Sequence, residues 1–168
     1  QFWLNCADAD VYKYLKYFTF LSAAEIEEIQ RSDEAAQARP EAQGILAKSV
    51  TELLHGSAGL EAASRISHAL FSGDIASLTD DDLQQLELDG LPCSTIEKGA
   101  EGIVDVLVAT GLAKSNKMAR EFLGNNAVSV NGETTQSQDL VLSAANALNG
   151  KYFVLKRGKK LFHLAKLA

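Results

Sequence analysis

Cysteine is scarce in this 168-residue sequence. Its two cysteines, Cys6 and Cys93, lie far apart and belong to no Cys-x-x-Cys or Cys/His ligand spacing. A disulfide framework is therefore not expected, and the sequence favours a reducing cytoplasm. His55 and His68 have no ligand residue three or four positions further on, so we expect no metal site in the chain.

Long apolar runs are equally absent. No stretch approaches the roughly 20 apolar residues that cross a bilayer, and no secretory signal is present. We therefore expect no membrane partner. The chain starts without Met, in the apolar segment 1–4, and we interpret it as a fragment of a longer protein.

A spaced pair of carboxylates, the arrangement that a glycosidase uses, is missing too. Asp80, Asp81 and Asp82 stand side by side at the start of an expected helix, where the positive end of the helix dipole favours them. An independent hydrolase therefore has no support in the sequence beyond unpaired histidines and carboxylates.

Charge of one sign dominates only part of the chain. The net charge is -6, but residues 1–97 carry 6 Lys+Arg against 17 Asp+Glu, whereas residues 98–168 carry 10 against 5. Such asymmetry suggests two domains with different partners. A basic domain beside an acidic one can hold a polyanion.

Residues 1–92 indicate an all-α helical domain without a convincing strand. Apolar residues recur at helical spacing, and Ser22 with Glu25 forms a capping box. Asp8 can cap the preceding helix. The expected helices cover residues 8–18, 22–31, 40–56, 60–71 and 79–90.

The rest of the chain has a different pattern. Residues 93–98 show no periodicity and coincide with the charge reversal, so we predict a linker there. Residues 99–168 indicate a small α+β domain, with Asn131 and Gly132 forming a tight turn. The expected helices cover 103–108 and 115–123, and the expected strands cover 127–130, 152–155 and 161–164.

Basic residues of the α+β domain fall in two clusters. One surrounds the start and polar face of the helix at 115–123, and the other occupies the tip of the last hairpin. Lysine and arginine contact phosphates, and a helix amino end adds backbone donors. Each cluster alone is as readily a solvated face or edge protection as an RNA contact, but two together favour RNA. The residues are Lys114, Ser115, Lys117 and Arg120, and then Lys156, Arg157, Lys159 and Lys160.

Aromatic residues are assigned mainly to packing. We expect Trp3, Phe18 and Phe20 to lie in the core of the helical domain. Tyr152 and Phe153 would offer RNA bases a stacking face if they were exposed.

Two segments of the α+β domain carry a family pattern. Residues 112–120 and 126–133 resemble the RNA-binding domain named after small-subunit ribosomal protein S-four. The matching positions are a Ser-x-x-x-Ala-Arg helix start and a Val-x-Val-Asn-Gly strand and turn. They comprise Ser115, Ala119, Arg120, Val128, Val130, Asn131 and Gly132.

The whole chain also resembles the C-terminal tRNA-binding region of bacterial-type tyrosyl-tRNA synthetases. Residues 1–11, 15–21, 70–73 and 155–160 are similar to parts of that family. The resemblance implies a helical anticodon-binding domain followed by an S-four-like RNA-binding domain. It also implies that the basic residues above, with Asn131, contact the anticodon stem and variable arm of tyrosine tRNA.

Further expectations follow from this resemblance. The parent enzyme would be a cytoplasmic homodimer that joins tyrosine to its tRNA with ATP and magnesium. Its catalytic domain, with the HIGH-type and KMSKS-type motifs, is absent from the sequence. We therefore expect the fragment to be a monomer that lacks cofactors and does not activate tyrosine alone.

Three acidic residues are candidates for reading the anticodon, because a carboxylate accepts two hydrogen bonds from guanine. They are Asp8, Asp10 and Asp139, although a helix cap is favoured for Asp8 and an ordinary loop carboxylate for Asp139. The alternative function is a stand-alone RNA-binding or ribosome-associated module with an acidic helical interaction domain.

Overall fold

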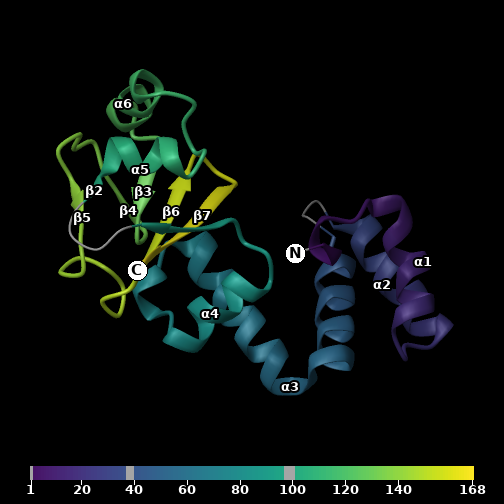
Figure 1. Ribbon diagram of the computed structural model, residues 1–168. Coiled ribbons are helices and arrows are strands. Elements are labelled where there is room, and N and C mark those ends of the chain that lie inside the picture. The colour runs from purple at the N-terminus through teal and green to yellow at the C-terminus, as the bar shows by residue number, and fades with distance from the viewer. Residues whose placement is uncertain (1, 37–39, 97–100) are drawn as a thin grey trace. The chain divides into compact units, whose positions relative to one another are not determined.

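The structure is a computed structural model that describes residues 2–36, 40–96 and 101–168 (Figure 1). The chain forms two compact units, Gln1–Ser64 and Arg65–Ala168. Their boundary lies inside helix α3 (Ala42–Ser72), not at the linker expected over 93–98. The charge reversal therefore does not coincide with the division between compact units. Among the described residues, no helix is both long and apolar enough to cross a membrane.

The first unit is helical, as expected. The short 3-10 helix η1 (Trp3–Asn5) precedes α1 (Asp8–Phe18) and α2 (Ala23–Ala35), and the first part of α3 completes the unit. Apolar side chains at helical spacing meet in one core. Its buried members are Val11, Leu15, Ile26, Ala42, Leu46 and Val50.

Helix α3 is interrupted at one residue. Gly56 has φ 71° and ψ 178°, a backbone conformation that residues with a Cβ rarely adopt. The sequence predicted two helices with a gap over 57–59, and the structure confines the interruption to Gly56.

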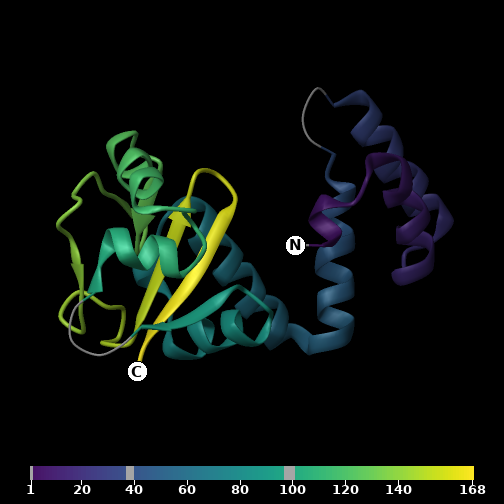
Figure 2. The same cartoon turned by 45° about the horizontal axis from the view of Figure 1, so that its top comes forward.

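The second unit is built on a five-stranded sheet in the order β1-β7-β6-β3-β4. Strand β1 (Cys93–Ile96) runs parallel to β7 (Leu161–Leu167), and every other pairing in the sheet is antiparallel. The remaining strands of this sheet are β3 (Val128–Val130), β4 (Glu133–Thr134) and β6 (Tyr152–Arg157). A separate two-stranded sheet pairs β2 (Glu101–Gly102) with β5 (Val141–Leu142). Figure 2 shows β6 and β7 as the long yellow hairpin.

Helices cover both faces of this sheet. Side chains alternate along a strand, so Phe153 and Leu155 of β6 face one side, whereas Tyr152 and Val154 face the other. The first side packs against α5 (Ile103–Ala109) and α6 (Asn116–Gly124). The second packs against the end of α3, the 3-10 helix η2 (Ile75–Ser77) and α4 (Asp80–Leu88), as Figure 1 shows.

Strand β1 corrects the predicted linker. Cys93–Ile96 pairs in register with Leu164–Leu167, and residues 97 and 98 lie outside the described residues. Two bonds reinforce the pairing, because Leu164 donates its amide to the carbonyl of Pro92, and His163 Nε2 lies 2.8 Å from Ser94 Oγ. Four residues with no alternation give no strand signal, and the partner strand lies about 70 residues later.

Aromatic burial differs from the expectation in both units. Phe18 is 43% exposed and Phe20 is 94% exposed, so neither belongs to the core, whereas Trp3 is half-buried against it. Tyr152 and Phe153 are buried in the sheet, so they offer RNA no stacking face. A strand buried on both faces leaves no aromatic surface free.

Candidate nucleic-acid interface

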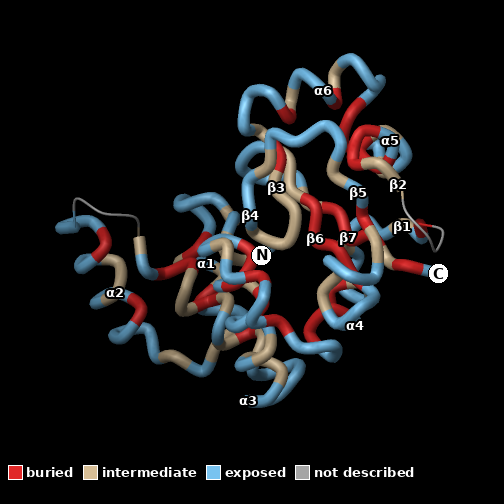
Figure 3. Tube along the Cα trace, turned by 90° about the vertical axis from the view of Figure 1, so that its left-hand side faces the viewer, coloured by how far each residue is buried: buried red, intermediate tan, exposed pale blue. Residues whose placement is uncertain are grey.

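The start of α6 presents the first basic cluster. Ser115 is the N-cap, and its hydroxyl accepts a hydrogen bond from the amide of Met118 at 3.3 Å. Ala119 and Leu123 are buried beneath the helix, so the opposite arc of α6 faces solvent (Figure 3). Lys117 and Arg120 are exposed on that arc, and Lys114 and Ser115 are exposed directly before the helix.

The turn between β6 and β7 presents the second cluster. Gly158 adopts φ 61°, and its amide donates to the carbonyl oxygen of Ala127 at 2.8 Å, which fixes the turn beside the start of β3. Lys159 and Lys160 are exposed at this turn. Their ammonium groups are therefore free to meet a phosphate.

Arg157 joins the two clusters. Its Nη1 donates to the carbonyl oxygen of Leu112 at 2.6 Å, and its guanidinium lies 5.0 Å from the ring centre of Phe122 in α6. The hairpin is thereby tied to the segment that leads into α6. Arg157 is half-buried, so part of its donor capacity is used inside the protein.

Lys156 occupies the opposite face of β6. Its ammonium nitrogen lies 5.1 Å from the ring centre of Phe162 on β7, and the side chain is half-buried. The four basic residues predicted for the hairpin thus divide among both faces of β6 and the turn.

Asn131 is engaged within the protein. It adopts φ 51° in the turn between β3 and β4. Its Oδ1 accepts from the amide of Val154 at 3.0 Å, and its Nδ2 donates to the carbonyl of Asn146 at 3.1 Å. The side chain therefore holds the turn to β6 and to the loop around Asn146.

The anticodon candidates lie in different environments. Asp8 is not a helix cap, because Ala7 is the N-cap of α1. The Oδ1 of Asp8 instead accepts a hydrogen bond from Nε2 of the buried Gln43. Asp10 is exposed in the first turn of α1. Asp139 is exposed in the turn before β5 (Val141–Leu142), in the other unit.

Sequence reasoning missed the aromatic partners of the basic residues. Phe122 and Phe162 lie under Arg157 and Lys156, and Phe71 at the end of α3 contacts Phe162. The helical spacing of Phe122 from Met118 indicates core packing and gives no sign of a cation above the ring. Nothing in the sequence pairs residue 71 with residue 162.

Candidate metal ligands were compared over the residues that the structure describes. Within the described parts of the chain, no group of three or more His, Cys, Asp or Glu side chains could hold a metal ion. The interface therefore offers cations from lysine and arginine, backbone donors at α6 and partly exposed aromatic rings.

Comparison with known proteins shows which family this sequence matches. A family model described as "Tyrosine–tRNA ligase SYY-like C-terminal domain" matches residues 82–165, and one described as "tRNA synthetases class I (W and Y)" matches residues 1–72. The first match contains both basic clusters.

Curated relatives agree with these matches. Tyrosine–tRNA ligase of Aliivibrio fischeri (strain MJ11) is 59% identical over 98% of this chain, and that of Chromobacterium violaceum is 53% identical over 98%. The chain spans 38% and 39% of their lengths. Among solved structures, a solution structure of a tyrosyl-tRNA synthetase C-terminal domain is 41% identical with a TM-score of 0.48, and the alignment covers 60% of this chain and 100% of that one.

Proposed function

The chain belongs to the tyrosine–tRNA ligase family, and from this premise we propose that it recognises tyrosine tRNA as part of an enzyme that attaches tyrosine to that tRNA. The observation that carries the proposal is the link between the two basic clusters through Arg157. A surface that combines fixed cations with backbone donors suits a folded polyphosphate.

The proposed phosphate contacts are the exposed basic residues. Lysines at the start of α6 and at the hairpin turn have ammonium groups in solvent, and Ser115 marks a helix amino end whose dipole favours an anion. Arg157 and Asn131 mainly hold other parts of the interface in place, since both side chains form hydrogen bonds inside the protein. The contact set is Lys114, Lys117, Arg120, Lys159 and Lys160, with Lys156 at its edge.

The helical unit is proposed to lie near the anticodon loop. Of its two candidates, Asp10 is the better reader of a guanine edge, because Asp8 already accepts a hydrogen bond from Gln43. Within the described residues the Asp10 carboxylate has no hydrogen-bonding partner, so both its oxygens are available. Asp139, which is exposed in the other unit, is the third candidate.

Catalysis is assigned to the parent enzyme. The chain spans about two fifths of its curated relatives, and we propose that tyrosine activation with ATP and magnesium requires the remainder. We further propose that the parent is a cytoplasmic homodimer and that this chain alone is a monomer. A stand-alone ribosome-associated module is not favoured, because the ligases match 98% of the chain.

The test is selective binding. Transcribed tyrosine tRNA and phenylalanine tRNA are titrated against the 168-residue chain at one salt concentration, and bound fractions are measured by fluorescence anisotropy. The proposal requires tighter binding of tyrosine tRNA. Equal affinity for both tRNAs would leave a general RNA-binding module instead.

A further inference from the structure

We infer that the second unit has a base-stacking site, at Phe71, Phe162 and Lys156, that takes one unpaired nucleobase of the bound RNA. The inference rests on the proposed function and adds a contact of a different kind. The site lies on the sheet face opposite to α5 and α6.

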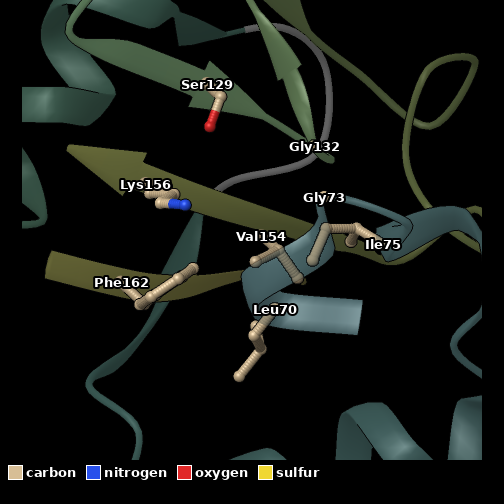
Figure 4. A pocket seen from close by; sticks show the side chains of 8 residues that line it. All are labelled: Leu70, Gly73, Ile75, Ser129, Gly132, Val154, Lys156 and Phe162. Carbon is tan, nitrogen blue, oxygen red and sulfur yellow. The ribbon is translucent and has the colours of Figure 1, made fainter. Parts of the chain in front are cut away.

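The site begins as a row across three strands. Ser129 of β3 pairs with Lys156 of β6, and Lys156 pairs with Phe162 of β7. Residues paired directly across neighbouring strands project from the same face, with strands about 4.8 Å apart. Figure 4 shows this row of a hydroxyl, an ammonium and an aromatic ring beside the end of α3. All three side chains are partly exposed.

Phe71 adds a second aromatic ring to the site. Its ring centre lies 6.0 Å from that of Phe162, and the two planes meet at 82°, so the edge of one ring meets the face of the other. Phe71 is 58% exposed although the core of this unit lies directly beside it at Leu70. A large aromatic side chain left in solvent offers a flat apolar surface.

The adjoining hollow suits a surface contact only. It has about 30 Å³ of free space, enough for a single water, so no small molecule can be enclosed there. Its floor is apolar, with Leu70, Ile75 and Val154, and Gly73 and Gly132 add no side chain. A ligand must therefore lie flat over one ring, as a stacked base does. That ring is the more exposed Phe71, because the Phe162 ring stands at 82° to it.

The positive charge beside the rings favours a ligand that carries negative charge. Lys156 is the one charged residue among the eight that line the hollow, and its ammonium lies 5.1 Å from the Phe162 ring centre. Lys159 and Lys160 follow it on the same hairpin and are exposed. An aromatic surface flanked by cations fits a base that is attached to a phosphate backbone. The site also continues the proposed phosphate contacts at the hairpin turn.

The experiment compares Phe71 variants of the 168-residue chain in binding to Aliivibrio fischeri tyrosine tRNA across salt concentrations. Phe71→Ala and Phe71→Leu are expected to weaken binding by about fivefold to 150-fold, the range for loss of one base stack. The slope of log K against log salt stays unchanged, because no phosphate contact is lost. Phe71→Tyr retains wild-type affinity because it keeps the ring.

A matched control is Leu88→Ala, which removes another exposed apolar side chain of the same unit, 79% exposed at the end of α4. The neighbouring Glu87 contacts Lys166, at the end of β7 that lies away from the basic turn. It should bind as the wild type does. Circular dichroism melting confirms that each variant is folded. A second readout is tyrosine tRNA with 2-aminopurine at one unpaired adenine at a time. Its fluorescence falls at one position on binding the wild type and not on binding Phe71→Leu.

The outcomes separate this inference from the proposed function. If the wild type binds tyrosine tRNA and Phe71→Leu binds it equally well, the stacking site is refuted and the proposed function stands. The stacking site is likewise refuted if Phe71→Leu changes only the salt slope. If the wild type binds no tRNA at low salt, both the proposed function and the stacking site are refuted.

Discussion

Arg157 Nη1 donates a hydrogen bond to the carbonyl oxygen of Leu112 at 2.6 Å, across 45 residues of sequence. The same guanidinium lies over Phe122 of α6. One side chain at the end of β6 therefore fixes the basic hairpin against the segment that starts the basic helix. The spacing of cations on the proposed interface depends on this contact.

Replacing Arg157 by Lys tests that contact. A lysine keeps the charge but cannot match the planar guanidinium that bonds Leu112 and stacks on Phe122. We expect Arg157→Lys to lower the free energy of unfolding by about 2 kcal/mol, from one charge-assisted hydrogen bond and one cation–π contact. Urea unfolding measures the loss, and Lys159→Arg serves as the exposed control. Wild-type stability in Arg157→Lys would contradict the role.

Gly132 is predicted to be intolerant of any side chain. An alanine Cβ there would collide with the carbonyl oxygen of Gly73, and φ is 90°. The backbone must therefore move as well as accept strain. The matched control is Gly158→Ala, where φ is 61° and the space is open, with an expected loss of about 1 kcal/mol. Thermal unfolding should show a loss at least twice as large for Gly132→Ala, and equal losses would refute the close approach.

The ion pair of Asp82 with Arg65 predicts a pH dependence. Asp82 is only 2% exposed, and its carboxylate accepts from Arg65 Nη2 at 2.7 Å and from Thr79 Oγ1 at 2.8 Å. Hydrogen bonding from Arg65, first of all, lowers the pKa of Asp82 from 3.8 to about 2. Since the folded pKa is the lower one, the stabilisation is complete above the unfolded pKa and disappears as pH falls through the folded value.

Asp82→Asn measures this contribution. At pH 7 the variant should be less stable by about 2–3 kcal/mol, because it loses a buried, hydrogen-bonded charge at the helix cap. The difference from the wild type should shrink between about pH 4 and pH 2. Denaturant unfolding at several pH values checks it, and a difference that stays constant down to about pH 2 would contradict the assignment.

Asn131 is predicted to act in folding. Asn131→Ala removes bonds to Val154 and Asn146 at a positive φ, so the free energy of unfolding should fall by about 1–3 kcal/mol. The slope of tRNA binding against salt should stay at its wild-type value. A folded variant of normal stability with a reduced slope would show that Asn131 contacts RNA instead.

Local sequence signals predict much of this fold. Apolar spacing predicts a first helix over 8–18, which is Asp8–Phe18 in the structure, and the capping box of Ser22 with Glu25 is present. Asn131 and Gly132 form the expected turn, since both adopt positive φ. These features depend on residues close in sequence, where spacing and caps carry the information.

Contacts between distant residues lie beyond sequence reasoning. Strand β1 has the pattern of a linker because its partner is the last strand of the chain. The acidic charge of residues 1–97 places α4 and the last part of α3 in the first domain. In the structure, the apolar faces of these helices pack on the sheet of the second unit. No sequence pattern predicts the hydrogen bond from Arg157 to the backbone carbonyl of Leu112. The sequence therefore indicates only that Arg157 contacts a phosphate.

The salt dependence of tyrosine tRNA binding tests the central claim most directly. Wild type, the double variant Lys117→Ala/Arg120→Ala and the control Lys151→Ala, an exposed lysine just before β6, are titrated across salt concentrations. The account predicts a linear fall of log K with log salt, a slope smaller by about 2 in the double variant, and an unchanged slope in the control. No binding at low salt, or an unchanged slope in the double variant, would contradict it.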